Sequence, residues 1–404
     1  MGKLVLKYSR TKRDFLICFI VISIVFSDIL GNGNLNLLYF FGIYLIIKNF
    51  KIRITILKDI AIFFLPFCLL LLISFFGSKN SFVPERVLAY ILKLFLCTTL
   101  LAYTKEYYWR IDQRKIIDLI CNCYGFFLIL SLATIKFPVL WRLNDSYNSF
   151  SKTRLKFLYS EPSVLGIICG VILIILMYYF FNKNSDQKMN RELLVLLIII
   201  ILTFSMSGIV YTAIGVTALF LTKTIGHKQR IPRKILILCL VGICALVMVL
   251  ATSNPISNRL LAMSMGMDGS YNFRWSAAIN AYNKIMRLTE NWGIGLGNMN
   301  TQAGLSRLLS VGMDYKMANS FLYFLTENGF LGMFYIFYLF LICLYHCFRC
   351  SKETRSLRVG LFFFVFMSQI AGGYFTDPIL WIVYGIVCSR ESNNCGLHFK
   401  DGII

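Results

Sequence analysis

The segment Tyr159-Ser160-Glu161-Pro162-Ser163 combines residue types that could do chemistry at a membrane boundary. It closely follows four cations, Arg142, Lys152, Arg154 and Lys156. A carboxylate here could act as a general base, and arginine side chains could bind a diphosphate through paired hydrogen bonds. The alternative is an ordinary helix start, in which the proline opens the first turn, the preceding Ser or Glu caps the exposed amides, and the cations reach the interface.

A second polar region interrupts the apolar pattern from about Ala251 to Lys316 and contributes further arginines. Arginine suits a diphosphate because its planar guanidinium makes bidentate hydrogen bonds and stays charged. These arginines are Arg259, Arg274, Arg287 and Arg307. We favour anion binding over a role in solubility for them.

A glycine-rich stretch, Gly293-Ile294-Gly295-Leu296-Gly297-Asn298, lies within this polar region. It superficially matches a dinucleotide-binding fingerprint, but the preceding strand and the later ribose-binding acid of that fingerprint are missing. A tight backbone turn that presents Asn298 to a ligand is the better interpretation.

Three polar residues, Asn319, Tyr323 and Glu327, follow at helical spacing in the next apolar segment and would line roughly one helix face. An ionisable group inside such a segment is a functional candidate. The alternative is that Glu327 lies near the interface and bonds to a neighbouring backbone. Lys93, in the middle of another apolar segment, carries the same ambiguity.

The elements that must position these residues are membrane helices. Hydrophobic residues make up 58% of the 404 residues and charged residues 15%, with a mean hydropathy of +0.69. Apolar runs able to cross roughly 30 Å of hydrocarbon predict an all-α polytopic bundle of about 12 spans, with 10–12 as the range. The expected spans are 15–30, 35–47, 59–77, 87–104, 116–135, 162–181, 193–204, 208–222, 235–251, 319–348, 359–375 and 378–389. The pair 193–204 and 208–222 could be two short helices or one bent element.

The net charge of +22 reflects membrane topology and does not indicate nucleic-acid binding. Of the 41 Lys and Arg residues, 27 fall in the segments that would face the cytoplasm, which predicts that both termini are cytoplasmic. Of the 13 on the outward side, 11 lie in two loops, 136–160 and 252–318. We therefore expect one membrane domain, 1–404, with a medium loop and a large, mainly helical loop on the outward side.

The large loop has a helical pattern of its own. After Asp268-Gly269-Ser270, the spacing predicts an amphipathic helix that lies against the bundle or the lipid headgroups. A second short helix is expected from Thr301 to Ser310.

The cysteines give no indication of a metal site. Cys121 and Cys123, and Cys343, Cys347 and Cys350 beside His346, have the residue types of metal ligands. Their helical spacing inside apolar runs favours small buried thiols instead. We expect neither a metal nor a cofactor.

Several of these segments together resemble bacterial O-antigen polymerases of the Wzy type, within the superfamily that also contains the O-antigen ligases. The matching motifs occur in the family's order over roughly residues 150–340. They are Tyr159-Ser160-Glu161-Pro162-Ser163, Thr203-Phe204-Ser205-Met206-Ser207-Gly208, Arg274-Trp275, Gly293-x-Gly295-x-Gly297-Asn298, and Asn319-Ser320-x-Leu322 followed by Glu327-Asn328-Gly329.

The resemblance implies a GT-C-like integral membrane glycosyltransferase in the bacterial inner membrane, with its active site on the periplasmic side. Such an enzyme transfers a growing glycan from undecaprenyl diphosphate to a new lipid-linked repeat unit. Expected partners are these undecaprenyl-diphosphate-linked oligosaccharides, the membrane lipid and a chain-length regulator protein. The alternatives are an O-antigen ligase that transfers glycan to lipid A-core and, in a different class, a flippase or transporter of lipid-linked oligosaccharides.

The resemblance also suggests roles for the candidate residues. Glu161 would accept the proton of the attacking hydroxyl. The diphosphate would bind Arg154, Arg259 and Arg274. Sugars would be positioned by Asn298, Asn319, Tyr323 and Glu327, with Trp275 and Trp292 stacking on them.

Two departures from the superfamily's pattern bear on this reading. Related ligases carry a functionally important His in the outward loop, whereas His227, His346 and His398 all lie on the cytoplasmic side or within spans in this topology, which favours a polymerase. Gly208 stands where many relatives have an Arg, so no phosphate-binding role transfers to that position.

Overall fold

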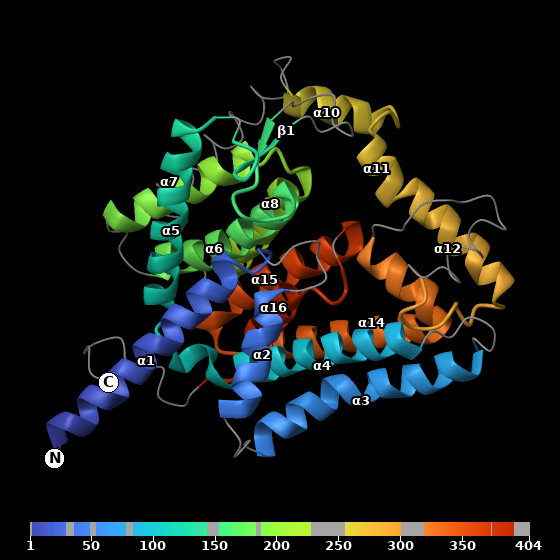
Figure 1. The fold of residues 1–404 in the computed structure, drawn as a ribbon, viewed down its shortest axis with the longest axis horizontal. Coiled ribbons are helices and arrows are strands. Elements are labelled where there is room, and N and C mark those ends of the chain that lie inside the picture. Colours follow the sequence, from blue (N-terminus) through green and yellow to red (C-terminus); the bar gives the residue numbers. More distant parts are fainter. Residues whose placement is uncertain are drawn as a thin grey trace.

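A computed structural model of the chain describes residues 2–29, 36–48, 54–77, 84–135, 137–143, 153–182, 187–227, 255–299, 319–372 and 374–391. These residues are mostly helical (Figure 1). The elements are α1 (Gly2–Val25), α2 (Leu37–Lys48), α3 (Ile54–Gly77), α4 (Pro84–Tyr107), the 3₁₀-helix η1 (Tyr108–Arg110), α5 (Gln113–Ala133), β1 (Trp141–Leu143), β2 (Thr153–Leu155), α6 (Pro162–Asn182), α7 (Gln187–Leu202), α8 (Met206–His227), α10 (Pro255–Ser264), α11 (Gly269–Arg274), α12 (Ser276–Leu288), α14 (Ser320–Phe348), α15 (Lys352–Ala371) and α16 (Pro378–Val387).

Several of these helices could cross a membrane. Within the described part of the chain, five are long and apolar enough to do so: Val87–Arg110, Gln113–Ala133, Pro162–Asn182, Met206–Thr224 and Ser320–Phe348. Each expected span that falls on described residues overlaps a helix. The expected span 235–251 lies outside the described residues. The chain therefore has the architecture of an all-α membrane protein.

The break between α7 and α8 is a turn between two separate helices. α7 ends at Leu202, α8 begins at Met206, and Phe204 between them has a left-handed backbone conformation with φ of 44°. The Ser205 hydroxyl accepts a hydrogen bond from the Gly208 amide (3.3 Å), which is the usual contact at a helix start. Of the two readings of this region, the structure contains the pair of helices.

Helix α6 lies in the core of the bundle, where it packs with α8 and α15 (Figure 1). It is apolar on every side, and 15 of its 21 residues are buried, as expected for a helix surrounded by others. Small residues let the three helices approach closely. A Cβ atom added to Gly208 of α8 would lie 3.0 Å from the Cα atom of Gly166 of α6.

The described part of the large loop forms an arc of helices, α10 to α12, along the edge of the bundle (Figure 1). α12 packs against α14 and buries Ala278, Ala281 and Ile285, while Lys284 and Arg287 are exposed. The helix predicted after Asp268-Gly269-Ser270 is present as α11 and α12, and the helix expected at 301–310 lies outside the described residues.

A small two-stranded antiparallel sheet was not expected in an all-α protein. β1 and β2 lie within the 136–160 loop, and Arg142 pairs with Arg154 in their register. Each strand has three residues, which is too short for an alternating pattern to be recognised in the sequence.

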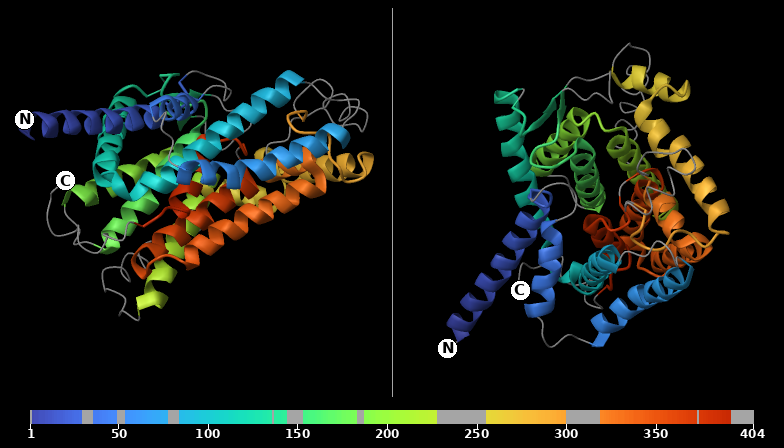
Figure 2. Two further views of the ribbon diagram at one scale, coloured as in Figure 1. Left: turned by 90° about the horizontal axis from the view of Figure 1, so that it is seen from below. Right: turned by 45° about the vertical axis from the view of Figure 1, so that its right-hand side comes forward.

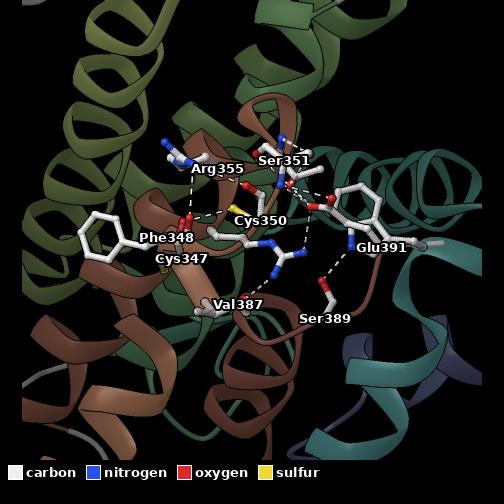
Figure 3. A network of polar contacts seen from close by, with 11 residues as sticks. Cys347, Phe348, Cys350, Ser351, Arg355, Val387, Ser389 and Glu391 are labelled. Carbon is white, nitrogen blue, oxygen red and sulfur yellow. Dashed lines mark hydrogen bonds and ion pairs between the residues drawn. The ribbon is translucent and has the colours of Figure 1, made fainter. Parts of the chain in front are cut away.

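Charged side chains gather at one end of the bundle, which we call the ion-pair end. Lys105 Nζ lies 2.8 Å from Asp59 Oδ1, and Arg390 Nη2 lies 2.9 Å from Asp59 Oδ2. Nearby, Arg358 Nη2 lies 3.0 Å from Glu391 Oε1, and Glu391 also accepts hydrogen bonds from the first residues of the α15 N-terminus (Figure 3).

The opposite end of the bundle holds the residues singled out in the sequence. Helices α4 and α14 lie along the length of the bundle (Figure 2), and α14 and α15 are joined at the ion-pair end. The start of α14 and the end of α15 therefore meet at the far end, where Asn319 bonds to Ile370. We call this region the Arg274 end, after the arginine that lies beside both helices.

Candidate functional site

Arg274 lies at the C-terminal end of α11, where three segments meet. Its backbone carbonyl accepts a hydrogen bond from Asn319 Nδ2 (3.4 Å). Its guanidinium lies against Gly372, since a Cβ atom added to this glycine would stand 3.2 Å from Nη1. Asp268 accepts from the Tyr271 amide and caps the start of this short helix. Arg274 is thus held through its backbone, and its side chain contacts the end of α15.

Asn319 is the residue that joins these segments. It caps α14 by accepting from the Leu322 amide (3.0 Å), and its Nδ2 donates to the Ile370 carbonyl of α15 (2.6 Å) as well as to Arg274. The side chain is 1% exposed. Because these hydrogen bonds all go to backbone groups, Asn319 supports the position of Arg274 and does not present its amide outward.

Glu161 lies exposed just before α6, which begins at Pro162 as the sequence predicted. Its Oε2 accepts from the Ser163 hydroxyl (3.0 Å). The preceding residue is fastened to the end of α1, because both the backbone amide of Ser160 (2.8 Å) and its hydroxyl donate to Asp28 Oδ2. The base candidate therefore stands on a turn with a fixed backbone while its own carboxylate remains accessible.

Tyr374 lies within electrostatic range of both Glu161 and Arg274. It lies in the turn between α15 and α16, it is 61% exposed, and the charges of both residues act on its hydroxyl. Partial burial raises the pKa of Tyr374, the Glu161 carboxylate raises it further, and Arg274 opposes them. The phenol therefore stays protonated at neutral pH and can donate a hydrogen bond.

The glycine stretch fills a break in α14. Gly329 interrupts this helix with φ of 58°, and the amides of Ile294 and Gly295 donate to the carbonyls of Thr326 (3.1 Å) and Glu327 (2.9 Å). The loop thus supplies hydrogen bonds that the helix cannot make for itself at the break. A Cβ atom added to Gly329 would stand 2.1 Å from the Asn291 carbonyl oxygen, so this close packing requires glycine.

Asn298 and Glu327 lie inside this packing. Both are fully buried, and Asn298 Nδ2 donates to the Ile294 carbonyl (3.0 Å). Glu327 Oε1 accepts a hydrogen bond from the Met299 amide (3.2 Å). The Tyr323 hydroxyl and the Gly297 amide also donate hydrogen bonds to this carboxyl group. The Glu327 Oε2 atom is buried without a hydrogen-bond partner among the described residues. Glu327 and Asn298 therefore hold the glycine loop against α14.

The other two arginines expected at a diphosphate are not brought beside Arg274 by the described contacts. Arg154 is 8% exposed, and its Nε donates to the Thr203 carbonyl at the end of α7 (3.0 Å). It therefore contacts the turn between α7 and α8. The backbone of Arg259 lies in α10, and its side chain lies outside the described residues.

The predicted residues form two groups that share the first part of α14. In one, Arg274 and Asn319 lie together, and Tyr374 lies within electrostatic range of Arg274 and Glu161. In the other, Tyr323, Glu327 and Asn298 surround the break, and Tyr90 of α4 lies within electrostatic range of Glu327 and Tyr323. Because eight helical residues rise about 12 Å, the two groups are neighbours along one helix.

Two contributors were missed in the sequence, Tyr374 and Asp28, because each lies in an apolar run that was read as a span. Tyr374 follows Gly372 and Gly373. Glycine near the end of an apolar run is a signal for a turn, and this signal could have placed Tyr374 outside the helix. An acid at the end of the first apolar run was a similar signal for Asp28.

The first group offers a cation and an accessible carboxylate that each lie within electrostatic range of a neutral phenol. A guanidinium can bind phosphate oxygens, a carboxylate can accept a proton, and a phenol can donate to a sugar or phosphate oxygen. This combination suits the transfer of a group away from a phosphate-containing leaving group. No protein-family model matches the chain, and no curated protein matches it either.

Proposed function

We propose that this protein is a membrane glycosyltransferase that polymerises a bacterial surface polysaccharide, in the manner of the O-antigen polymerases that its motifs resemble. The observation that carries the proposal is that the exposed Tyr374 lies within electrostatic range of both Arg274 and Glu161, and that the Arg274 guanidinium lies against Gly372 at the end of α15. A hydrophobic helix bundle around such a group suits a substrate with a lipid tail and a polar head.

In the proposed reaction, a hydroxyl at the non-reducing end of a lipid-linked repeat unit attacks the anomeric carbon of the growing glycan. The new glycosidic bond forms as the bond between that carbon and the diphosphate oxygen breaks, and undecaprenyl diphosphate leaves. Glu161 accepts the proton of the attacking hydroxyl. Arg274 stabilises the charge on the departing diphosphate.

The proposal includes an orientation. The Arg274 end faces the periplasm, and the ion-pair end and both chain termini face the cytoplasm, in a GT-C-like bundle of about 12 spans in the inner membrane. The distribution of Lys and Arg along the sequence supports this orientation, because 27 of the 41 lie in the segments assigned to the cytoplasm. The starts of α6, α8 and α14 and the ends of α1 and α15 would all face outward together.

The test is the surface glycan of a strain that lacks the gene, displayed as a size ladder on a gel. A polymerase predicts lipid A-core that carries a single repeat unit, with the longer rungs gone. Core without any repeat, together with long glycan on the lipid carrier, would identify a ligase instead. An unchanged ladder would reject both enzymes and return a flippase or transporter as the leading hypothesis.

A further inference from the structure

The turn that carries Tyr374 is held on several sides. The Asp377 amide donates to the Tyr374 carbonyl (3.0 Å), which closes a four-residue turn. The Thr376 carbonyl accepts from the Tyr39 hydroxyl of α2 (2.5 Å), and the Phe375 carbonyl accepts from the Trp381 indole of α16 (2.7 Å). The turn is therefore tied to two helices through its backbone.

The side chain of the second turn residue fixes the turn further. The Phe375 ring is 2% exposed and stacks on Phe324 of α14, with ring centroids 4.3 Å apart. The same ring also contacts Trp381 edge to face at 5.6 Å. Because Phe375 is anchored in the core, its neighbour Tyr374 is left pointing outward, and 61% of its surface is exposed.

An exposed tyrosine on a fixed turn is suited to contact a ligand. Its side chain has only two rotatable angles, so ordering it against a ligand costs little conformational entropy. Its hydroxyl lies within electrostatic range of a carboxylate, Glu161, and of a guanidinium, Arg274. A ligand that contacts these two groups would therefore lie within electrostatic range of the phenol.

We propose that the Tyr374 hydroxyl donates a hydrogen bond to the lipid-linked substrate, at the oxygen that joins the sugar to the diphosphate. This inference rests on the proposed function, since it names a further substrate-binding residue of the same site. Glu161 would lie toward the acceptor hydroxyl and Arg274 toward the phosphates, so the oxygen between sugar and phosphate would face Tyr374. A hydrogen bond to this oxygen becomes stronger as its bond to carbon breaks and negative charge develops on it.

The test compares Tyr374→Phe with wild type and with a control at the ion-pair end, Tyr345→Phe. Tyr345 is 51% exposed, so both variants remove one phenolic hydroxyl from a partly exposed ring. Each purified protein, in lipid nanodiscs, receives undecaprenyl-diphosphate-linked repeat units isolated from the strain that carries the gene, and its rate of chain growth is measured. We expect Tyr374→Phe to lower kcat about tenfold or more with a smaller change in KM, and Tyr345→Phe to match wild type.

A wild-type kcat in Tyr374→Phe would overturn the inference, because the ring would remain and only the hydroxyl would be gone. Equal melting temperatures of the three proteins establish that a lower rate is not caused by unfolding. If Tyr374→Phe unfolds, the rate of Tyr374→His, which keeps a hydrogen-bond donor, is compared with that of Tyr374→Leu, which has none. A rate of Tyr374→His that is no higher than that of Tyr374→Leu overturns the inference. The gene deletion tests the function separately: a lost ladder that Tyr374→Phe restores in full contradicts this inference alone, whereas an intact ladder contradicts the proposed function.

Discussion

The two ends of the helix bundle differ in whether their charged side chains form ion pairs. At the ion-pair end, Asp59 contacts both Lys105 and Arg390, and Arg358 contacts Glu391. At the Arg274 end, Asp28, Glu161, Arg274 and Asp377 form no ion pair with another described residue.

Asp28 and Asp377 hold backbone amides of Ser160 and Ile379, which leaves Glu161 and Arg274 as the charges available for a ligand. A partly buried charge is costly unless a partner compensates it, so a pair such as Asp59 and Lys105 indicates a structural role. Charged side chains that form no ion pair and lie near one another are instead candidates for binding or catalysis. The following predictions test the Arg274 end by substitution, and one of them compares it directly with the ion-pair end.

The largest effect is expected for Glu161→Gln. If Glu161 is the proton acceptor, as proposed, its loss should lower the rate of chain growth about 1,000-fold, because general base catalysis commonly contributes that much. The measurement is the glycan ladder of the deletion strain that expresses the variant, with its membrane level checked by immunoblot. Glu161→Asp keeps a carboxylate and should retain part of the ladder. Full-length polymer in Glu161→Gln would remove Glu161 as the base.

Two arginines, one from each end, form a matched pair for the next prediction. Arg274→Ala should reduce chain growth about 100-fold at a normal protein level, because it removes the charge-assisted hydrogen bonds proposed between Arg274 and the diphosphate. Arg358→Ala should instead destabilise the protein by about 3 kcal/mol, because it leaves Glu391 without its cation. Melting temperature in detergent and chain growth per molecule of folded protein are measured for both. The comparison fails if both variants lose stability equally and keep the same specific activity.

A smaller effect is expected for Asn319→Ser. Serine can still cap α14, but it cannot donate to Ile370 and Arg274 as the amide Nδ2 does. We expect a stability loss of about 1 kcal/mol and a rise in KM of about tenfold as Arg274 loses its support. KM is measured with purified lipid-linked repeat units. An unchanged KM together with reduced stability would limit Asn319 to holding the helices together.

The smallest effect concerns the pH dependence of stability. Burial raises the pKa of Asp377 to about 6, while its hydrogen bond from the Ile379 amide lowers it and the nearby Asp28 raises it. Because the folded protein then holds this proton more tightly than the unfolded chain, the free energy of unfolding falls as the pH rises from about 4 to 6. Asp377 as a whole residue is half-buried, so solvent screens the effect and we expect a loss of only about 1 kcal/mol.

Asp377→Asn should remove this part of the pH dependence and still cap α16, since its side-chain oxygen can accept from the same amide. Melting temperature between pH 4 and 7 is measured for both proteins. If the melting temperature of the variant depends on pH as it does in the wild type, Asp377 does not contribute to the pH dependence.

The helices could be predicted from the sequence because each depends on a local pattern. The apolar runs predicted where the described helices lie, and Pro162 predicted the start of α6. The contacts between segments could not be predicted in the same way. Nothing in the local pattern indicates that Asn319 bonds to Ile370, or that Arg154 bonds to Thr203, because these pairs are far apart along the chain.

The candidate site could be predicted only in part, because the local pattern shows residue types but not contacts between distant segments. Arg274, Asn319 and Glu161 were noticed from their types, which are unusual beside apolar segments. Their separate roles depend on burial, which the sequence does not reveal: Asn319 and Glu327 are enclosed, whereas Glu161 is exposed. Tyr374 was missed because an aromatic residue is ordinary in an apolar run.

The break in α14 has a consequence for how this region opens. The amides of Ile294 and Gly295 bond to α14 carbonyls, and the Phe330 amide bonds back to the Asn291 carbonyl (3.0 Å). Neither segment can leave without breaking the hydrogen bonds of the other, so the loop and the helix break form one cooperative unit. In hydrogen–deuterium exchange, these three amides should exchange at a common rate, and a substitution at Gly329 should raise all three rates together.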